Sequence, residues 1–305
     1  MPAPIAMFVY NRKDHAQETI EALAQNDLAK DSDVFIHSDG PSKPEHQAGV
    51  EGVRAYLDTL EAKGYFKSVT LIKAPQNIGL SKSIITGVSN IMKRYGQAII
   101  IEDDLVSSRD VLRFLNDGLD FYKDKEDIWA VGAYNIPIDI PDDYGYDVYK
   151  AYRTNSWGWA SWGDRWKKID WKMKDYASFL KSRQRQRYFM RGGNDLLEML
   201  SLQMQGKLQS WDSVWCYHQA KFKSFTIYPT VSRIKNIGFD GSGYHGNVNE
   251  SFDIPFSQEP KPYTLTYPEV DPIIQKRFLK HFYKYPTWMR RLKRRVKRVI
   301  GMVKR

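Results

Sequence analysis

The stretch Ala98-Ile99-Ile100-Ile101-Glu102-Asp103-Asp104-Leu105 decides how the rest of the sequence is interpreted. Its four apolar residues in a row indicate a strand buried on both faces, as parallel strands are. Three acids follow directly, and their mutual repulsion is costly unless a cation or a network of donors offsets it. Carboxylate oxygens suit Mg²⁺ or Mn²⁺, which commonly bind one or two carboxylates together with substrate phosphates. The alternative is an acidic helix N-terminus.

Strand and helix patterns alternate on both sides of this stretch. Further short apolar runs predict strands at residues 5–10, 34–37, 69–72 and 128–133, and helical patterns lie between them. This order predicts an α/β fold, a mostly parallel sheet with helices on both faces. Ligands of such sheets bind beyond the carboxyl ends of the strands. The polar residues that follow these strands are therefore the candidates: Asn11, Arg12, Asp39, Glu102, Asp103 and Asp104.

Composition narrows the function classes. The chain has 305 residues, 42% of them apolar and 27% charged, which is an ordinary globular mix. A single Cys excludes a disulfide framework and a thiolate metal cluster. The six His form no metal-binding pair at helical spacing, and no apolar run is long enough to span a membrane. With no signal-peptide pattern, we expect a cytoplasmic protein.

The net charge of +10 is concentrated at one end of the chain. Residues 285–305 hold nine Lys or Arg and no acid, which leaves the other residues almost neutral. Apolar residues recur there at steps of three and four, so we expect a basic amphipathic helix over 286–305. Such a helix is typical of attachment to an anionic membrane surface, although it could instead pack on the body. Nucleic acid is not expected, because no binding motif accompanies the charge.

Three further constellations carry possible chemistry. Arg12 and Asp39 end neighbouring strands and could bind a nucleotide or simply form an ion pair. Asn77 and Lys82 lie at a strand-to-helix turn that could contact a nucleotide or only begin a helix. Asp212 stands between Trp211 and Trp215, where partial desolvation would suit a general base. A helix-capping Asp is the alternative.

The run Gly241-Ser242-Gly243-Tyr244-His245-Gly246 matches the dinucleotide fingerprint GxGxxG. Because no apolar strand leads into it and no amphipathic helix follows, that interpretation is rejected. A glycine-rich lid is the better interpretation, with His245 as a metal or phosphate ligand.

Together these residues resemble the nucleotide-sugar glycosyltransferases of the GT-A fold, over roughly residues 3–250. More narrowly, they resemble the N-acetylglucosaminyltransferase I family and its bacterial relatives in glycosyltransferase family 2. The family's Glu-Asp-Asp-Leu metal motif matches residues 102–105. Its Tyr-Arg-Thr and Gly-Trp segments match residues 152–154 and 158–159, and its Ser-Arg start of the lid matches Ser232 and Arg233. Two departures are Asn11 in place of an Asp and one extra residue between the two Trp of the Trp-Asp segment.

The resemblance implies a UDP-sugar donor, Mn²⁺ or Mg²⁺, and inversion at the anomeric carbon. Asp104 would hold the metal, with His245 as a later ligand, and Asp212 would be the catalytic base. The implied donor-site residues are Arg12, Asp39, Asn77, Lys82, Glu102, Asp103, Ser232 and Arg233. The implied substrate-binding residues are Trp157, Gly158, Trp159 and Trp211, since flat indole faces suit a sugar ring.

We therefore expect a catalytic domain over residues 1–250, with a nucleotide-binding half at 1–135 and an acceptor-binding half with the lid at 136–250. Residues 251–305 would be a C-terminal extension. The acceptor would be a glycan or a lipid-linked glycan in surface polysaccharide or lipooligosaccharide assembly, at the cytoplasmic face of the membrane. Open alternatives are a sugar-nucleotide pyrophosphorylase, a catalytically inactive sugar-binding or membrane-binding protein of the same fold, and an anionic-lipid or RNA-binding protein.

Overall fold

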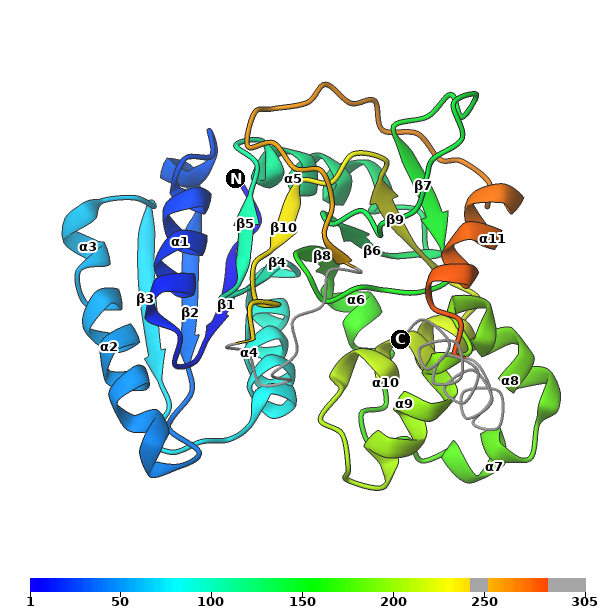
Figure 1. Cartoon of the computed structure of the whole chain (residues 1–305), viewed down its shortest axis with the longest axis horizontal. Coiled ribbons are helices and arrows are strands. Elements are labelled where there is room, and N and C mark those ends of the chain that lie inside the picture. Colours follow the sequence, from blue (N-terminus) through cyan, green and yellow to red (C-terminus); the bar gives the residue numbers. More distant parts are fainter. Residues whose placement is uncertain (242–251, 285–305) are drawn as a thin grey trace, which may run out of the picture.

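The computed structural model describes residues 1–241 and 252–284, whose arrangement is shown in Figure 1. A central sheet has the strand order β3-β2-β1-β4-β8-β6-β9-β7. Its strands are β1 (Ile5–Val9), β2 (Asp33–Ser38), β3 (Ser68–Lys73), β4 (Gln97–Glu102), β6 (Ile128–Gly132), β7 (Val148–Ala151), β8 (Trp159–Trp162) and β9 (Phe225–Pro229). Beside it, β5 (Leu105–Ser107) pairs antiparallel with β10 (Ile234–Asn236). The two expected halves, 1–135 and 136–250, therefore share one sheet.

The expected α/β fold with a mostly parallel sheet is confirmed. β1, β2, β3 and β4 are parallel neighbours, and β6 and β9 run in the same direction. Two strands run the other way. β8 lies between β4 and β6 and is antiparallel to both, and β7 is antiparallel to β9 at the sheet edge. Sequence reasoning misses β8, because its Trp-Ala-Ser-Trp sequence was equally compatible with a binding surface.

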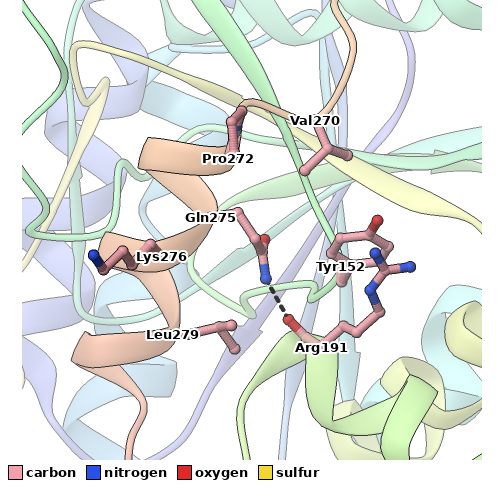
Figure 2. Close-up of a pocket in the computed structure, with 7 residues that line it drawn as sticks. All are labelled: Tyr152, Arg191, Val270, Pro272, Gln275, Lys276 and Leu279. Carbon is pink, nitrogen blue, oxygen red and sulfur yellow. Dashed lines mark hydrogen bonds between the residues drawn. The ribbon is translucent and has the colours of Figure 1, made fainter.

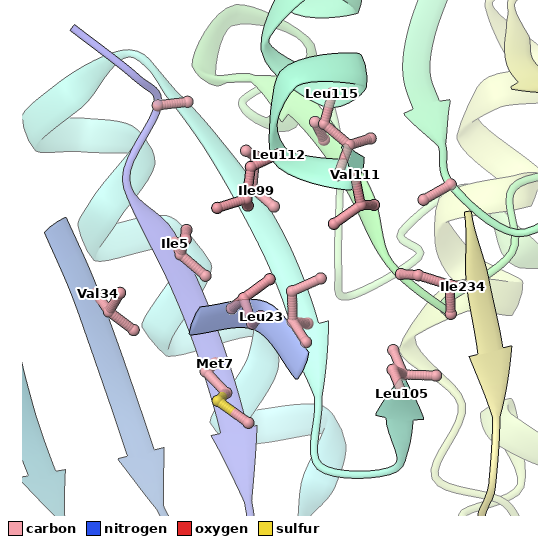
Figure 3. Packing of buried hydrophobic residues seen from close by; sticks show 14 of the residues in the cluster. Ile5, Met7, Leu23, Val34, Ile99, Leu105, Val111, Leu112, Leu115 and Ile234 are labelled. Atoms are coloured by element: carbon pink, nitrogen blue, oxygen red, sulfur yellow. The ribbon is translucent and has the colours of Figure 1, made fainter. Parts of the chain in front are cut away.

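Helices cover both faces of the sheet, because alternate residues of each buried strand point to opposite sides. Ile5 and Met7 pack with α1, α2 and α5, as Figure 3 shows in part, whereas Ala6 and Phe8 belong to the core under α4, α9 and α10. The helices are α1 (Lys13–Ala24), α2 (Gln47–Leu57), α3 (Leu60–Lys63), α4 (Leu80–Tyr95), α5 (Val111–Tyr122), α6 (Gly163–Trp166), α7 (Tyr176–Leu180), α8 (Arg183–Phe189), α9 (Asp195–Met204), α10 (Trp211–Lys221) and α11 (Pro272–His281). Three short 3-10 turns are η1 (Ala29–Asp31), η2 (Pro44–His46) and η3 (Met190–Gly192).

The described part of the C-terminal extension packs on the body of the protein. Residues 253–271 form no helix or strand and run back past α5, where the Tyr263 hydroxyl donates to Asp117 at 2.6 Å. α11 then buries Ile274 and Phe278 against Tyr149 and Tyr228 of β7 and β9. The basic helix expected over 286–305 lies outside the described residues.

Candidate active site

The carboxyl ends of β1, β2 and β4 lie at one edge of the sheet, because these strands are parallel neighbours. Glu102 is the last residue of β4, and Asp103 and Asp104 form the turn into β5. The Nη2 group of Arg12 donates to Oδ1 of Asp103 at 2.8 Å and to Oδ2 of Asp104 at 2.7 Å. Arg12 thus forms ion pairs with two of the three residues 102–104, which together form the acidic turn. Asp39 lies apart from this pairing.

Two polar residues that sequence reasoning misses hold these strand ends. Thr19 is fully buried in α1; its hydroxyl donates to the carbonyl of Asp103 and accepts from the N–H of Leu105, both at 3.0 Å. Arg54 of α2 donates to the carbonyls of Ser38 at 3.2 Å and Ala74 at 2.6 Å. Thr19 lies on the otherwise apolar face of α1. A polar residue on such a face was the feature of the sequence that could have identified it.

Burial and neighbouring carboxylates shift the pKa values of Glu102 and Asp103. Burial raises the pKa of Glu102 well above its ordinary value, and the charges of Asp104, Asp103 and Asp212 raise it further. Burial and Asp104 also raise the pKa of Asp103, although Arg12 and the backbone N–H of Tyr10 oppose this. Burial lowers the pKa of Arg12, but the charges of Asp103 and Asp104 outweigh it and the net shift is upward. Arg12 therefore offsets only part of the negative charge gathered at residues 102–104.

Asp212 approaches the acidic turn from the opposite half of the chain. It lies in the first turn of α10 and interacts electrostatically with Glu102. Its Oδ1 atom accepts from the N–H of Ser213 at 3.0 Å and from the hydroxyl of Ser210. Among the contacts of the described residues, Oδ2 has no hydrogen-bond donor, which leaves it able to accept a proton.

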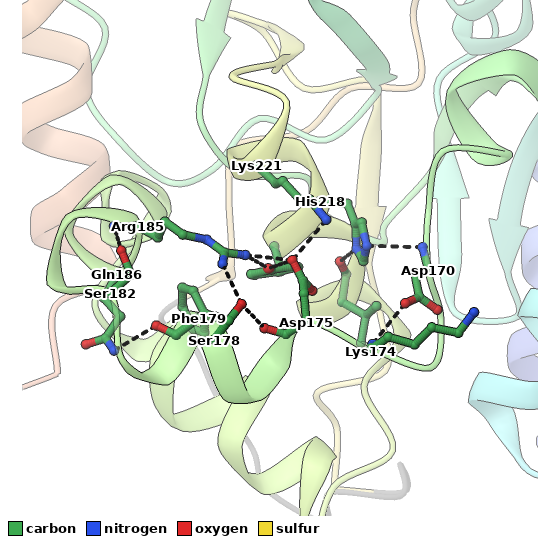
Figure 4. Close-up of polar contacts among 12 residues, drawn as sticks. Asp170, Lys174, Asp175, Ser178, Phe179, Ser182, Arg185, Gln186, His218 and Lys221 are labelled. Carbon is green, nitrogen blue, oxygen red and sulfur yellow. Dashed lines mark hydrogen bonds and ion pairs between the residues drawn. The ribbon is translucent and has the colours of Figure 1, made fainter.

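The far end of α10 is fixed by a polar network (Figure 4). Oδ2 of Asp175 accepts from the Tyr217 hydroxyl at 2.7 Å and from Nζ of Lys221 at 2.9 Å. Nε2 of His218 accepts from the N–H of Asp170 at 3.1 Å, so the proton of the neutral ring lies on Nδ1, which is 2.9 Å from the carbonyl of Val214. This anchoring holds the helix that carries Asp212.

Asp39 shapes a loop rather than pairing with Arg12. Its carboxylate accepts from the N–H groups of Gly40, Ile78 and Gly79 at 2.8, 2.9 and 3.0 Å, and from the side-chain amide of Asn77 at 3.1 Å. Gly79 has φ of +83°, a conformation that favours glycine. The structure thus brings Asp39 and Asn77 into contact. Lys82 is exposed on the first turn of α4.

Arg233 does not reach this edge of the sheet, so its assignment to the donor site is wrong. It is 2% exposed and forms an ion pair with Asp110 at 2.5 Å. The guanidinium lies over the rings of Phe114 and Tyr263, 4.6 Å from each centroid. Ser232 is also buried, and its hydroxyl accepts from the N–H of Asn135 at 3.0 Å and donates to the carbonyl of Ile234 at 2.7 Å. Both residues fix the start of β10.

The residues expected to bind substrate, Trp157, Gly158, Trp159 and Trp211, differ in how deeply they are buried. Trp159 and Trp211 are 0% and 3% exposed and stack on each other with centroids 5.2 Å apart, so the expectation that they present a ring to a sugar is wrong. Gly158 has φ of +65° and packs against Ile234, where a Cβ would lie 2.0 Å from the Ile234 side chain. Trp157 is half-buried and keeps part of its surface exposed.

Residues after β10 cover part of the acidic turn. The N–H of Ile237 donates to the carbonyl of Asp104 at 2.8 Å. A Cβ on Gly238 would lie 2.1 Å from Oδ2 of Asp104, so a larger residue here would have to displace that carboxylate. Asp240 lies 3.2 Å from Nε2 of His15. The expected ligand His245 and the GxGxxG residues 242–246 are outside the described residues.

The acidic turn has oxygen donors that fit Mg²⁺ or Mn²⁺, since Asp103 and Asp104 provide two carboxylates with charge to neutralise. Within residues 1–241 and 252–284, no group of three or more His, Cys, Asp or Glu is arranged to hold a metal. A separate open groove of about 370 Å³ lies beside α11, between Leu279 and the side chains of Tyr152 and Arg191 (Figure 2). None of the strand-end residues lines it.

Comparison with known proteins does not assign the chain to a family. No protein-family model matches the chain, and no curated protein is significantly similar to it. In the described part of the chain, every helix is too short or too polar to cross a membrane.

Proposed function

We propose that the chain is a metal-dependent, inverting glycosyltransferase of the GT-A type that moves a sugar from a UDP-sugar to a hydroxyl of a glycan or glycolipid. One observation carries the proposal. Glu102, at the end of β4, interacts electrostatically with Asp212, a carboxylate in the first turn of α10. A site for a cation and phosphates thus lies within electrostatic reach of a candidate base, as transfer from a nucleotide sugar requires.

The donor would bind across the ends of β1, β2 and β4. Asp39 and residues 77–79 form the wall that would receive the uracil ring. Their mutual hydrogen bonds fix that wall before the ligand arrives, which lowers the entropy lost on binding. Glu102 and Asp103 would bind ribose and sugar hydroxyls. The carboxylate oxygens of Glu102 can accept hydrogen bonds from such hydroxyls.

A divalent cation held by Asp104 would neutralise charge on the diphosphate and so stabilise UDP as it leaves. Arg12 lies against the same carboxylates and supplies a second positive charge at this point. Asp212 would take the proton of the acceptor hydroxyl through Oδ2, while Ser210 and Ser213 hold Oδ1. Of the Trp residues at 157, 159 and 211, Trp157 is the one that is only partly buried, so the exposed part of its surface remains for an acceptor sugar.

The basic residues at 285–305 support a location at the cytoplasmic face of the membrane, as a peripheral protein. Lipid-linked acceptors are presented at such a surface, which is why surface polysaccharide or lipooligosaccharide assembly is the proposed setting.

Calorimetric titration of UDP with and without Mn²⁺ tests this function. We expect micromolar binding that needs the metal. Asp104→Ala should abolish the metal dependence, because it removes the principal ligand. Asp14→Ala, which removes an exposed acid of the neighbouring helix α1, should change little and is the matched control. If UDP does not bind under either condition, the transferase proposal fails and an inactive protein of the same fold becomes the better interpretation.

A further inference from the structure

Arg12 contacts both Asp104, which would hold the proposed cation, and the neighbouring carboxylate of Asp103. A single nitrogen, Nη2, contacts Oδ1 of Asp103 at 2.8 Å and Oδ2 of Asp104 at 2.7 Å. The three side chains are only 17%, 9% and 16% exposed, so water screens these contacts weakly. A cation bound to the same oxygens would meet the guanidinium charge at close range.

The second terminal nitrogen of Arg12 has no comparable partner. Nη1 is buried and has no hydrogen-bond acceptor among the residues that the structure describes. A buried donor that lacks an acceptor is costly, and native proteins rarely keep one without a reason. Among the described residues, Asp103 and Asp104 therefore satisfy only part of the guanidinium, and Nη1 can donate to an anion.

From these two features, and on the basis of the proposed function, we infer that Arg12 and the divalent cation are alternative partners of the Asp103–Asp104 pair. Arg12 neutralises the pair while the site is empty. When the cation binds, Arg12 is released to the diphosphate, whose oxygens satisfy both terminal nitrogens. Arg12 is then a residue that couples the binding of cation and nucleotide.

This arrangement has a thermodynamic consequence. Without nucleotide, the cation must displace Arg12 from the carboxylates, so its affinity is reduced. With nucleotide present, the diphosphate takes up Arg12 and this penalty disappears. Cation and nucleotide then each raise the affinity for the other by the same factor. A protein in which Arg12 only stabilises the fold would not show this reciprocity through Arg12.

The test measures Mn²⁺ affinity of the full chain from the free-ion electron paramagnetic resonance signal, with and without UDP. Arg12→Met should bind Mn²⁺ alone about tenfold more tightly than the unaltered protein, and the enhancement by UDP should fall by a similar factor. Lys13→Met removes an exposed positive charge one residue away and should leave both quantities nearly unchanged. If Arg12→Met does not fold, Arg12→Gln makes the same test, because it removes the charge but keeps an N–H donor.

The outcomes separate this inference from the function on which it rests. If the unaltered protein binds UDP with Mn²⁺ but Arg12→Met binds Mn²⁺ alone no more tightly, the competition is refuted and the proposed function stands. An equal gain in Lys13→Met would also refute it, because general electrostatics would then suffice. If the unaltered protein and the Arg12 variants bind neither Mn²⁺ nor UDP, the proposed function and this inference are both overturned.

Discussion

The guanidinium of Arg233 lies 2.5 Å from Oδ2 of Asp110, and the two side chains are 3% and 8% exposed. Lys261 adds a backbone hydrogen bond to the same carboxylate oxygen at 3.1 Å. The pair therefore joins β10, the start of α5 and the returning segment at 253–271. Its position accounts for how the segment at 253–271 is tied to residues 1–135.

Arg233→Met should strongly destabilise the protein, because it leaves the carboxylate of Asp110 buried without its positive partner. We expect the free energy of unfolding in urea to fall by about 3–5 kcal/mol. The control is Arg109→Met, whose partner Glu259 lies 3.3 Å away on the surface, with side chains 48% and 66% exposed. That change should cost less than about 1 kcal/mol.

The same two variants test the correction of the donor site. Arg233→Met should keep its affinity for UDP under conditions in which it is folded, since Arg233 does not reach the strand ends. Equal stability losses in the two variants would contradict the buried-pair argument. A selective loss of UDP affinity would return Arg233 to the donor site.

The sequence was sufficient to predict the five strands of the first half that belong to the central sheet and most of its helices, because these buried strands are short apolar runs and the helices have an apolar stripe. The three-residue strand β5 was not predicted, since Leu105–Ser107 is too short to show a pattern. The sequence was also sufficient to bring Arg12 together with residues 102–104, since parallel strands end at one edge. It was not sufficient for Arg233 or Trp159. Residue type does not reveal how deeply a side chain is buried. An Arg or a Trp can equally well bind a ligand or pack in the core. Burial depends on contacts between residues far apart in the chain, such as Arg233 with Asp110 and Trp159 with Trp211.

His37 should make the protein less stable in mild acid. Its ring stacks on Phe8 with centroids 4.9 Å apart, and burial lowers its pKa from 6.5 to about 4. Because the unfolded chain binds a proton more readily, the stability from His37 is fully present above pH 6.5 and is lost as the pH falls towards 4. Between pH 6.5 and 5 the loss should be about 2 kcal/mol.

The measurement is the free energy of unfolding at several pH values for the unaltered protein and for His37→Phe, which keeps an aromatic ring against Phe8. Subtracting the two curves removes the contributions of the other titrating groups, including His218 and His281. Parallel curves between pH 7 and 5 would show that His37 is not the group responsible.

Residues 285–305 should attach the protein to anionic membranes. With nine basic residues and no acid, a chain ending before Pro286 should lose most of its binding to phosphatidylserine vesicles, and added salt should weaken binding of the full chain. Co-sedimentation with anionic and zwitterionic vesicles measures the binding of each chain, and a thermal melt checks that the chain is folded. The control is Lys276→Gln with Lys280→Gln on the exposed side of α11. If the shortened chain still binds and the α11 variant does not, the attachment surface lies on α11 instead.

Asp212→Asn should separate binding from chemistry. The amide keeps the size of the side chain and can still accept hydrogen bonds from Ser210 and Ser213, so α10 and the affinity for UDP with Mn²⁺ should be unchanged. The amide cannot take a proton, and transfer to an acceptor should therefore fall by about 10²–10⁴-fold.

UDP release in the presence of acceptor measures the rate. The control Asp164→Asn removes an exposed aspartate of α6, whose side chain is 57% exposed, and should leave the rate near normal. Near-normal transfer by Asp212→Asn would move the base elsewhere. Glu102 would then be the next carboxyl to test, because it interacts electrostatically with Asp212 and burial raises its pKa.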